Sequence, residues 1–326
     1  MVTKPTPFAV VIPLFQKRAY VARAVESVLD QSHPASELIV VDDGSTDGGG
    51  DEVRRLFPRV RVIRQENSGV GAARNLGIDE TTSPWIALLD ADDYWTPQHL
   101  EQLARMVAFD PEAVLLSTRW KRVVHGTSET LATSGDGSIK RIDYFMHAAK
   151  RGGPVWTSSA AISRRAYEHI GGFGSASLGE DQEYWARLAL FGPVVVSSAV
   201  TAAYVRGVES VTETHRRSAR AEIVPRTAAD ALPVFATVES ALESDESRVP
   251  KASLHAFWNA KIAGKTGEAV SRSEFERARA LASFMKPPLT SGERLLARGV
   301  QLPTWTLRCA LALRRRIRQR DRSGDT

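Results

Sequence analysis

The chain has 326 residues, 43% of them hydrophobic and 25% charged, and its formal net charge is +5. This composition excludes a disordered chain, and the length is enough for one large domain and a smaller part. The single cysteine, Cys309, excludes an internal disulfide framework and predicts a reducing, cytoplasmic location.

Neither a membrane span nor a signal peptide is expected. A span needs about 18 uninterrupted apolar residues, and the sequence has no such run. The start, MVTKPTPFAVVIPLF, is too short and wrongly flanked for a signal peptide.

Apolar runs alternate with amphipathic segments in the first third of the sequence. The runs predict buried strands, and apolar residues at helical spacing predict helices. The expected strands are 8–14, 37–41, 60–64 and 85–89, and the expected helices are 20–31, 47–57, 71–80 and one that starts at Thr96 or Pro97. This alternation predicts a mostly parallel α/β sheet, which binds ligands beyond the carboxyl ends of its strands.

The remainder of the sequence is less regular. We expect strands at 114–124, 158–163 and 194–205, helices at 164–170 and 180–190, and a loop or exposed hairpin at 125–138. After about Arg216 the sequence becomes rich in Ala and Arg and helical in pattern. The predicted organisation is therefore a domain over 1–215 and a helical region over 216–326.

Two groups of acids follow predicted strands. Asp42 and Asp43 follow the second strand, and Asp90, Asp92 and Asp93 follow the fourth. Carboxylate oxygens suit Mg²⁺ or Mn²⁺, which typically bind one or two carboxylates plus substrate phosphates. The alternative is that each group is a solvated turn that caps the next helix.

A glycine-containing segment precedes the helix expected at 71–80. NSGVGAARNLGI places Arg74 and Asn75 early in that helix. Cationic side chains beside the free N–H groups of a helix start favour phosphate binding. The alternative is a turn followed by surface residues.

These motifs, in this order, resemble a family 2 glycosyltransferase. The matching stretches are VIPLF, VVDDGSTDG, NSGVGAARNLGI, LLDADDYW, GGF and LGEDQEYWARL, and they cover about residues 8–212. The resemblance implies a GT-A fold, a Rossmann-like nucleotide-sugar-binding domain, and inverting transfer of a sugar. It also implies an Mn²⁺ or Mg²⁺ cofactor, and a donor that we expect to be a UDP-sugar.

The resemblance assigns roles to individual residues. Asp42 or Asp43 would hydrogen-bond the base, and Asp90 would contact the ribose or the sugar. Asp92 would bind the metal, with Asp93 as a third acid. The remaining donor-binding residues would be Pro13, Leu14, Arg74 and Asn75.

The acids of GEDQ are open to two interpretations. From the residues alone they are acids in the first turn of a helix, which the helix dipole favours. The resemblance makes Asp181 the general base that deprotonates the acceptor hydroxyl, with Glu180 orienting the acceptor or the base. Trp156 and Trp185 are either sugar-stacking or core residues.

One segment departs from the family pattern. Family members often carry Tyr-Arg-x-His before Ser-x-Ser/Thr, whereas Gly207 stands here at the histidine position, counted from Ser210. His215 is displaced from it. Either Arg206 neutralises the donor diphosphate in its place, or the dependence on metal is weak.

The last 30 or so residues mix apolar residues with arginines. One interpretation is a packed helix with a solvated end. The other is attachment to an anionic membrane surface, on the inner face of the cell membrane. Nucleic-acid binding is not expected, because no recognition motif accompanies the arginines. The arginines concerned are Arg314, Arg315, Arg316, Arg318, Arg320 and Arg322.

We therefore predict an inverting glycosyltransferase that acts on a saccharide or lipid-linked acceptor in the biosynthesis of a surface polysaccharide, a glycolipid or another glycan. One alternative is a nucleotidyltransferase, but PLFQKRAYV lacks the glycine-rich phosphate loop expected after the first strand. The other is a non-catalytic sugar-nucleotide-binding module. The presence of both Asp92 and Asp181 argues against it.

Overall fold

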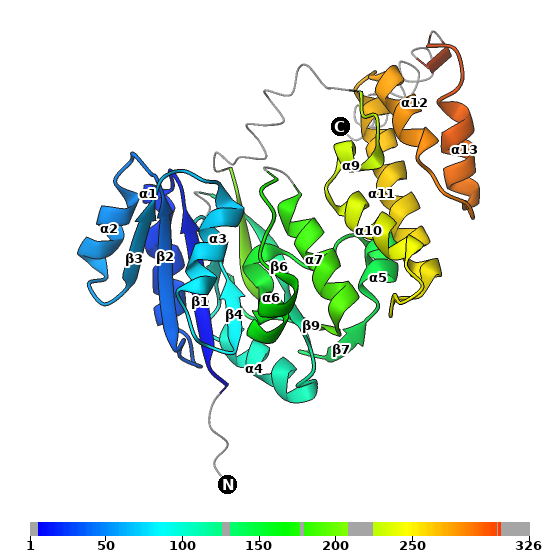
Figure 1. Cartoon of the computed structure of the whole chain (residues 1–326). Helices are drawn as coiled ribbons and strands as arrows, with labels where there is room; N and C mark the ends of the chain where they lie inside the picture. Colours follow the sequence, from blue (N-terminus) through cyan, green and yellow to red (C-terminus); the bar gives the residue numbers. More distant parts are fainter. Residues whose placement is uncertain (1–5, 126–130, 177–178, 208–223, 305, 308–326) are drawn as a thin grey trace, which may run out of the picture. The chain divides into compact units, whose positions relative to one another are not determined.

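The apolar runs near the N-terminus form neighbouring parallel strands in the structure, which is a computed structural model (Figure 1). It describes residues 6–125, 131–176, 179–207, 224–304 and 306–307. β1 pairs with β2 and β4, and β2 pairs with β3. These strands are β1 (Phe8–Leu14), β2 (Glu37–Asp43), β3 (Arg61–Gln65) and β4 (Trp85–Leu88). The helices between them are α1 (Arg18–Leu29), α2 (Gly49–Leu56) and α3 (Val70–Asp79).

Alternate residues of β1 face different helices, as the pleat of a strand requires. Phe8, Val10 and Ile12 share a buried cluster with apolar residues of α1 and α4 (His99–Phe109). Val11 faces α3 on the other side of the sheet, where a Cβ added to Gly77 would collide with its Cγ1 atom. Glycine at position 77 therefore lets α3 lie directly against β1.

Beyond β4 the sheet is mixed. Among the described residues nine strands form one sheet, in the order β3-β2-β1-β4-β8-β6-β9-β5, with β7 paired to β9. β8 is antiparallel to β4 and β6, whereas β6 and β9 are parallel. The predicted α/β fold class is confirmed, and the parallel pairing is continuous over its first four strands. The later strands are β6 (Leu115–Val124), β8 (Ala160–Ser163) and β9 (Val194–Arg206).

Several short elements were not predicted. β5 (Tyr94–Trp95) pairs with β9 directly after the acids, and β7 (Ile139–Ile142) leads into α5 (Tyr144–Arg151). A 3₁₀ turn, η1 (Thr157–Ser159), precedes β8. Helix α4 begins at His99, later than expected. The last two helices of this part are α6 (Arg164–Ile170) and α7 (Glu180–Phe191).

The chain divides into two compact units, Met1–Ser218 and Ala219–Thr326. The predicted boundary near residues 215–220 lies outside the described residues. The second unit is helical, and Trp258 is buried in it against Phe235. Its helices are α9 (Ala228–Ala231), α10 (Val234–Glu243), α11 (Lys251–Ser271), α12 (Phe275–Ser283) and α13 (Ser291–Gly299).

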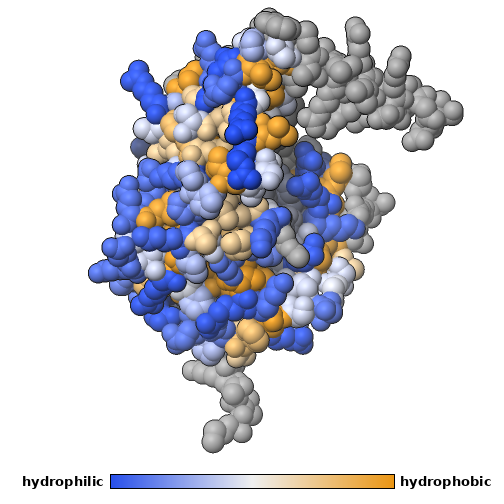
Figure 2. All heavy atoms as spheres, turned by 90° about the vertical axis from the view of Figure 1, so that its right-hand side faces the viewer, coloured by the Kyte–Doolittle hydropathy of each residue, from blue (hydrophilic) through white to orange (hydrophobic). Residues whose placement is uncertain are grey.

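The surface face drawn in Figure 2 is largely hydrophilic, with hydrophobic residues scattered across it. Isolated exposed apolar side chains such as Leu295, which is 74% exposed, are ordinary for a folded surface. None of the described helices is long and apolar enough to cross a membrane.

His99, at the start of α4, is a fully buried titratable group. Its Nδ1 atom lies 2.7 Å from the Thr201 hydroxyl, and its ring stacks on Trp95 at a centroid distance of 4.2 Å. Its Nε2 atom has no hydrogen-bond partner among the described residues. Burial lowers the pKa of His99 to about 3, so the folded protein keeps this ring neutral.

Acid should therefore destabilise the fold through His99. The folded-state pKa lies below the unfolded value, so the unfolded chain takes up a proton that the folded chain refuses as the pH falls from 6.5 towards 3. We expect this group to remove about 2 kcal/mol of unfolding free energy between pH 7 and pH 5. Urea unfolding of wild type and His99→Phe at both pH values measures it. Equal pH dependence of the two proteins would contradict the assignment.

Candidate active site

The parallel strands bring the predicted site residues to one edge of the sheet. β1, β2 and β4 run in the same direction, so their carboxyl ends lie together. Pro13 and Leu14 end β1 at this edge, but both are buried. Leu14 pairs with Asp42 on β2, and Asp90 follows β4 two residues after its end.

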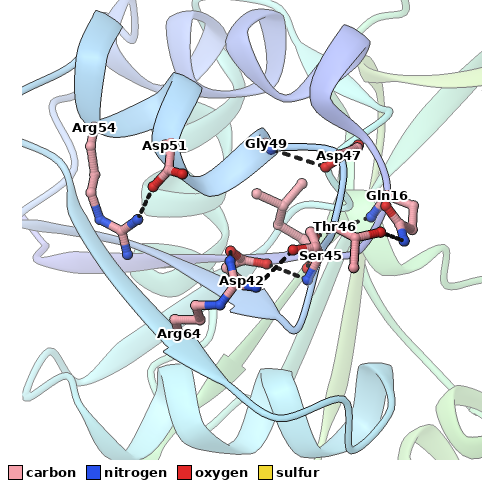
Figure 3. Close-up of polar contacts among 10 residues, drawn as sticks. Gln16, Asp42, Ser45, Thr46, Asp47, Gly49, Asp51, Arg54 and Arg64 are labelled. Atoms are coloured by element: carbon pink, nitrogen blue, oxygen red, sulfur yellow. Dashed lines mark hydrogen bonds and ion pairs between the residues drawn. The ribbon is translucent and has the colours of Figure 1, made fainter.

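Asp42 is fully buried and its carboxylate is occupied by protein groups (Figure 3). One oxygen accepts a hydrogen bond of 2.8 Å from the Ser45 backbone N–H, and the other lies 2.8 Å from Nη1 of Arg64. Arg64 also donates to the Ser45 carbonyl oxygen at 2.8 Å. These contacts fix the turn between β2 and α2.

Asp43 ties β2 to the segment that enters α3. Its carboxylate accepts hydrogen bonds from the backbone N–H groups of Ser68 at 2.8 Å and Gly69 at 2.9 Å. It also accepts one from the Gln65 side chain at 2.7 Å. Asp43 is only 3% exposed, so its described contacts are those of a residue that shapes the glycine-containing turn.

Arg74 connects the acids after β4 with the start of α7. Its guanidinium lies 2.8 Å from Oδ1 of Asp90 and 3.1 Å from Oε1 of Glu180, and its side chain is only 4% exposed. Glu180 and Asp181 lie in the first turn of α7, where the family resemblance predicts the general base. Asp90 and the first turn of α7 are therefore joined through the buried side chain of Arg74.

The charges in this network support each other. Burial alone would lower the pKa of Arg74, but Asp90 and Glu180 more than offset it and raise that pKa above its ordinary value. Burial raises the pKa of Glu180, which the adjacent Arg74 opposes. Removing the guanidinium would leave two poorly solvated carboxylates side by side.

The side-chain amide of Asn75 binds the backbone of the GGF segment, residues 171–173. Its Nδ2 atom donates to the Phe173 carbonyl oxygen at 3.0 Å, and its Oδ1 atom accepts from the Phe173 N–H at 2.8 Å. A Cβ on Gly172 would collide with the same amide group. Arg74 and Asn75, which were predicted to contact the donor, thus make their described contacts with the protein.

Asp92 is paired with a lysine from the loop after β1. The Lys17 ammonium nitrogen lies 2.9 Å from Oδ2 of Asp92, and the two side chains are 15% and 18% exposed. Arg23 donates to the Asp92 carbonyl oxygen at 3.4 Å. Burial raises the pKa of Asp92, although Lys17 acts in the opposite direction.

Asp93 points into the protein towards η1 and β9. It accepts hydrogen bonds from the Ser158 hydroxyl at 2.5 Å, the Trp156 indole at 3.1 Å and the Val205 N–H at 2.9 Å. Burial, followed by Asp92 and Asp90, raises the pKa of Asp93 well above its ordinary value. Asp92 thus pairs with Lys17, whereas the described partners of Asp93 are Ser158, Trp156 and Val205.

The carboxylate oxygens at this edge are suitable ligands for a hard divalent ion. Asp90 and Asp92 are carboxylates, and Asp92 already holds a cation in the form of the Lys17 ammonium. The described residues contain no group of three or more His, Cys, Asp or Glu side chains placed to bind a metal. A site of one or two carboxylates completed by substrate phosphates does not need such a group.

Asp181 is partly exposed, and its Oδ1 atom accepts from the Gln182 N–H at 2.7 Å. Burial, with Asp181 as a further cause, raises the pKa of Tyr144 on α5. Trp185 is 1% exposed and belongs to the core. Trp156 is partly exposed and packs on Tyr204 at a centroid distance of 4.2 Å.

Arg206 ends β9 and is exposed, so its side chain is available to solvent. Ser210, Val211, Thr212 and His215 lie outside the described residues, as do Cys309 and the arginines of the C-terminal tail. The fold also brings in residues that the sequence did not single out. Lys17 and Ser158 contact the acids after β4, but no local pattern marks either as a partner of these carboxylates.

Comparison with known proteins gives a consistent family. The model of Glycosyl transferase family 2 matches residues 9–171. An uncharacterized glycosyltransferase, alr2836 of Nostoc sp., is 29% identical over 170 residues, which are 50% of this chain and 52% of that protein. The putative teichuronic acid biosynthesis glycosyltransferase TuaG of Bacillus subtilis is 41% identical over 98 residues, 29% of this chain and 39% of that protein. The chain thus spans about half the length of these curated relatives, or less.

Two solved structures share the fold at low sequence identity. S. aureus TarS 1–349 in complex with UDP-GlcNAc has a TM-score of 0.68 at 16% identity, over 95% of this chain and 92% of that one. The mannosyltransferase PcManGT from Pyrobaculum calidifontis, in complex with GDP-Man and Mn²⁺, has a TM-score of 0.58 at 19% identity. That match covers 95% of this chain and 84% of the other.

Proposed function

The chain belongs to glycosyl transferase family 2, and from this membership we propose that it is an inverting enzyme that moves a sugar from a nucleoside-diphosphate donor to an acceptor hydroxyl. The observation that carries the proposal is the Arg74 bridge. It joins Asp90, at the end of β4, to Glu180 at the start of α7. The bridge supports a common site for Asp90 and for the turn of α7 that carries Asp181.

The proposed reaction is a single displacement. Asp181 accepts the proton of the acceptor hydroxyl as the oxygen attacks the anomeric carbon. A new carbon–oxygen bond forms on one face of the sugar while the bond to the diphosphate breaks on the other, so the configuration inverts. Glu180, fixed by Arg74, orients the acceptor or Asp181. The nucleoside diphosphate leaves with the electrons of the broken bond.

The leaving diphosphate needs positive charge around it. Asp92 would hold an Mn²⁺ or Mg²⁺ ion, which when bound neutralises charge on the diphosphate, and Asp90 would contact the ribose or the sugar. Asp93 remains a predicted metal-binding acid beside Asp92, although its oxygens accept three hydrogen bonds from the protein. Arg206 remains the predicted side chain that contacts the diphosphate. Its exposed position at the end of β9 is compatible with that role.

The donor pocket is proposed at the ends of β1 and β2. Pro13 and Leu14 would line it from β1, and Asp42 or Asp43 would reach the base. In the free protein Asp42 and Asp43 accept hydrogen bonds from the backbone N–H groups of Ser45 and Ser68, and these contacts stabilise the turns at the edge of the proposed pocket. Arg74 and Asn75 would complete it at the start of α3. The solved neighbours bound UDP-GlcNAc in one case and GDP-Man in another, so a UDP-sugar is the first donor to test.

The acceptor is proposed to be a saccharide or a lipid-linked glycan. The name of TuaG concerns teichuronic acid biosynthesis, which favours an acceptor in the assembly of a surface polysaccharide. Cytoplasmic location and attachment to the inner face of the membrane through the arginine-rich tail stay predictions from the sequence. The tail lies outside the described residues.

A donor panel tests the proposed function. Purified protein is screened against UDP-, GDP-, dTDP- and CDP-sugars by thermal shift with Mn²⁺, with Mg²⁺ and with EDTA, and donor hydrolysis is followed by NMR. We expect one donor to raise the melting temperature and to release slowly its sugar with inverted anomeric configuration. Pyrophosphate release from a nucleoside triphosphate would instead indicate a nucleotidyltransferase. Binding of a donor without hydrolysis or transfer would indicate a non-catalytic module.

A further inference from the structure

The loop between β1 and α1 is held in a strained conformation. Gln16 has a φ of 54°, in the left-handed region that non-glycine residues rarely adopt. Its N–H donates to the Ser45 hydroxyl at 3.2 Å, and its side-chain amide donates to the Thr46 hydroxyl at 2.8 Å (Figure 3). The turn after β2 therefore fixes the backbone directly before Lys17.

The residue after Lys17 is fixed by the same turn. The Arg18 N–H donates to Oδ2 of Asp47 at 2.8 Å. The backbone is thus fixed on both sides of Lys17, while the Lys17 side chain itself extends to Asp92. Strain that the surroundings impose on one loop residue is typical of a functional position.

A purely structural ion pair explains this arrangement poorly. The ammonium and the carboxylate are both largely withdrawn from water, and the desolvation of such a pair offsets most of its attraction. Arg18 next to it follows a different pattern: it is exposed and pairs with Glu52 on α2 at 3.5 Å. The chain directs only the first of these two neighbouring cations into the acids after β4.

Asp90 and Asp92 are each paired with a cation in the free protein. Arg74 neutralises Asp90 and Lys17 neutralises Asp92. Arg74 is held by a second carboxylate and is rigidly buried, whereas Lys17 has a flexible four-carbon stem and a compact ammonium with three N–H donors. Lys17 is the cation of this pair that can exchange one anionic oxygen for another.

We propose that Lys17 is a resident cation of the donor site, which holds Asp92 in the free protein and serves as a direct cationic contact for the diphosphate of the donor. This inference rests on the proposed function, because it places the diphosphate at the acids after β4. Two properties follow. A divalent ion must compete with Lys17 for Asp92, so the nucleotide-free protein binds it weakly. A nucleoside diphosphate retains a contact cation even without a divalent ion.

The test compares Lys17→Met with wild type in two binding measurements by calorimetry. In EDTA, with UDP or with GDP if UDP does not bind, the dissociation constant should rise roughly tenfold in the variant, because a charge-assisted contact is lost. With Mn²⁺ alone and no nucleotide, the variant should bind more tightly, also by roughly tenfold, because the competing charge is gone. Methionine keeps the aliphatic stem but leaves Asp92 without its cation. Circular dichroism and urea unfolding therefore establish first that the variant is folded under the binding conditions.

Three further variants sharpen the test. Lys140→Met makes the same change at an exposed position on β7 and should behave as wild type in both measurements. Lys17→Arg keeps the charge and should restore nucleotide binding in EDTA to within a few-fold. Asp92→Asn frees Lys17 and should bind the nucleotide in EDTA at least as tightly as wild type does.

The inference requires both changes in Lys17→Met. If either dissociation constant equals that of wild type, or if Asp92→Asn loses nucleotide binding in EDTA, Lys17 is a structural partner of Asp92 and the inference is wrong. If wild type binds neither UDP nor GDP under any condition while the fold is intact, the proposed donor site itself is wrong and the inference fails with it. The wild-type measurement therefore separates failure of the proposed function from failure of the role of Lys17.

Discussion

Asp181→Asn is expected to lower turnover by roughly 10²-fold or more, the usual scale of general-base catalysis. Asparagine is nearly isosteric with aspartate, and its amide oxygen can still accept the hydrogen bond from the Gln182 N–H. It cannot take up the proton of the acceptor hydroxyl at neutral pH. Steady-state transfer with the donor found in the panel gives kcat and KM, and calorimetry gives the donor affinity of the same protein.

The donor affinity of Asp181→Asn should remain close to that of wild type. Glu183→Gln is the matched control, because Glu183 lies in the same turn but pairs with Arg187 along α7. It should keep turnover within a few-fold of wild type. A collapse of donor affinity in Asp181→Asn, with normal turnover of bound donor, would make Asp181 a donor-binding residue and refute its role as base.

Arg74→Met is expected to destabilise the first unit by about 3–5 kcal/mol and to abolish most of the activity. Methionine fills the space of the side chain but leaves the largely buried carboxylate of Glu180 and the partly buried carboxylate of Asp90 without their cation. Removing one partner of a buried ion pair has an effect of this size. Urea unfolding at pH 7, monitored by circular dichroism, measures the loss of unfolding free energy.

Rescue separates this positioning role from donor contact. Adding Asp90→Asn and Glu180→Gln to Arg74→Met removes the unpaired charges, so most of the unfolding free energy should return while activity stays low. Arg74→Lys should fall between wild type and Arg74→Met, because lysine keeps the charge but not the planar geometry that reaches both acids. If Arg74→Met unfolds at the same urea concentration as wild type and loses only nucleotide affinity, Arg74 is a donor contact and its pairing with Asp90 and Glu180 does not stabilise the fold.

The parallel half of the sheet was predictable because its information is local. The runs 8–14, 37–41 and 85–89 are largely apolar, and a helical pattern follows each of them, which is enough to predict strand, helix and crossover. β5 has two residues and β7 has four, too few to show any periodicity. The antiparallel insertion of β8 between β4 and β6 depends on contacts across the chain, which no local pattern encodes.

The candidate site was predictable to a similar extent. The acids at strand ends were found because strand direction brings them to one edge, whereas the GEDQ turn was singled out through the family resemblance. Their partners were not, since the contact of Lys17 with Asp92 and of Ser158 with Asp93 joins residues 75 and 65 positions apart in the sequence. Arg74 was singled out from the sequence. Its pairing with Glu180 arises only when α3 and α7 are packed on the same sheet.

The bond between Asn75 and the Phe173 backbone bears on how this fold can diversify. Because Asn75 contacts only the main chain there, the side chain at position 173 can change without breaking the contact. Gly172 has no such freedom, since any Cβ would strike the Asn75 amide. In chimeras that exchange the segment leading to α7 between relatives, Gly172 and Asn75 therefore have to be transplanted together.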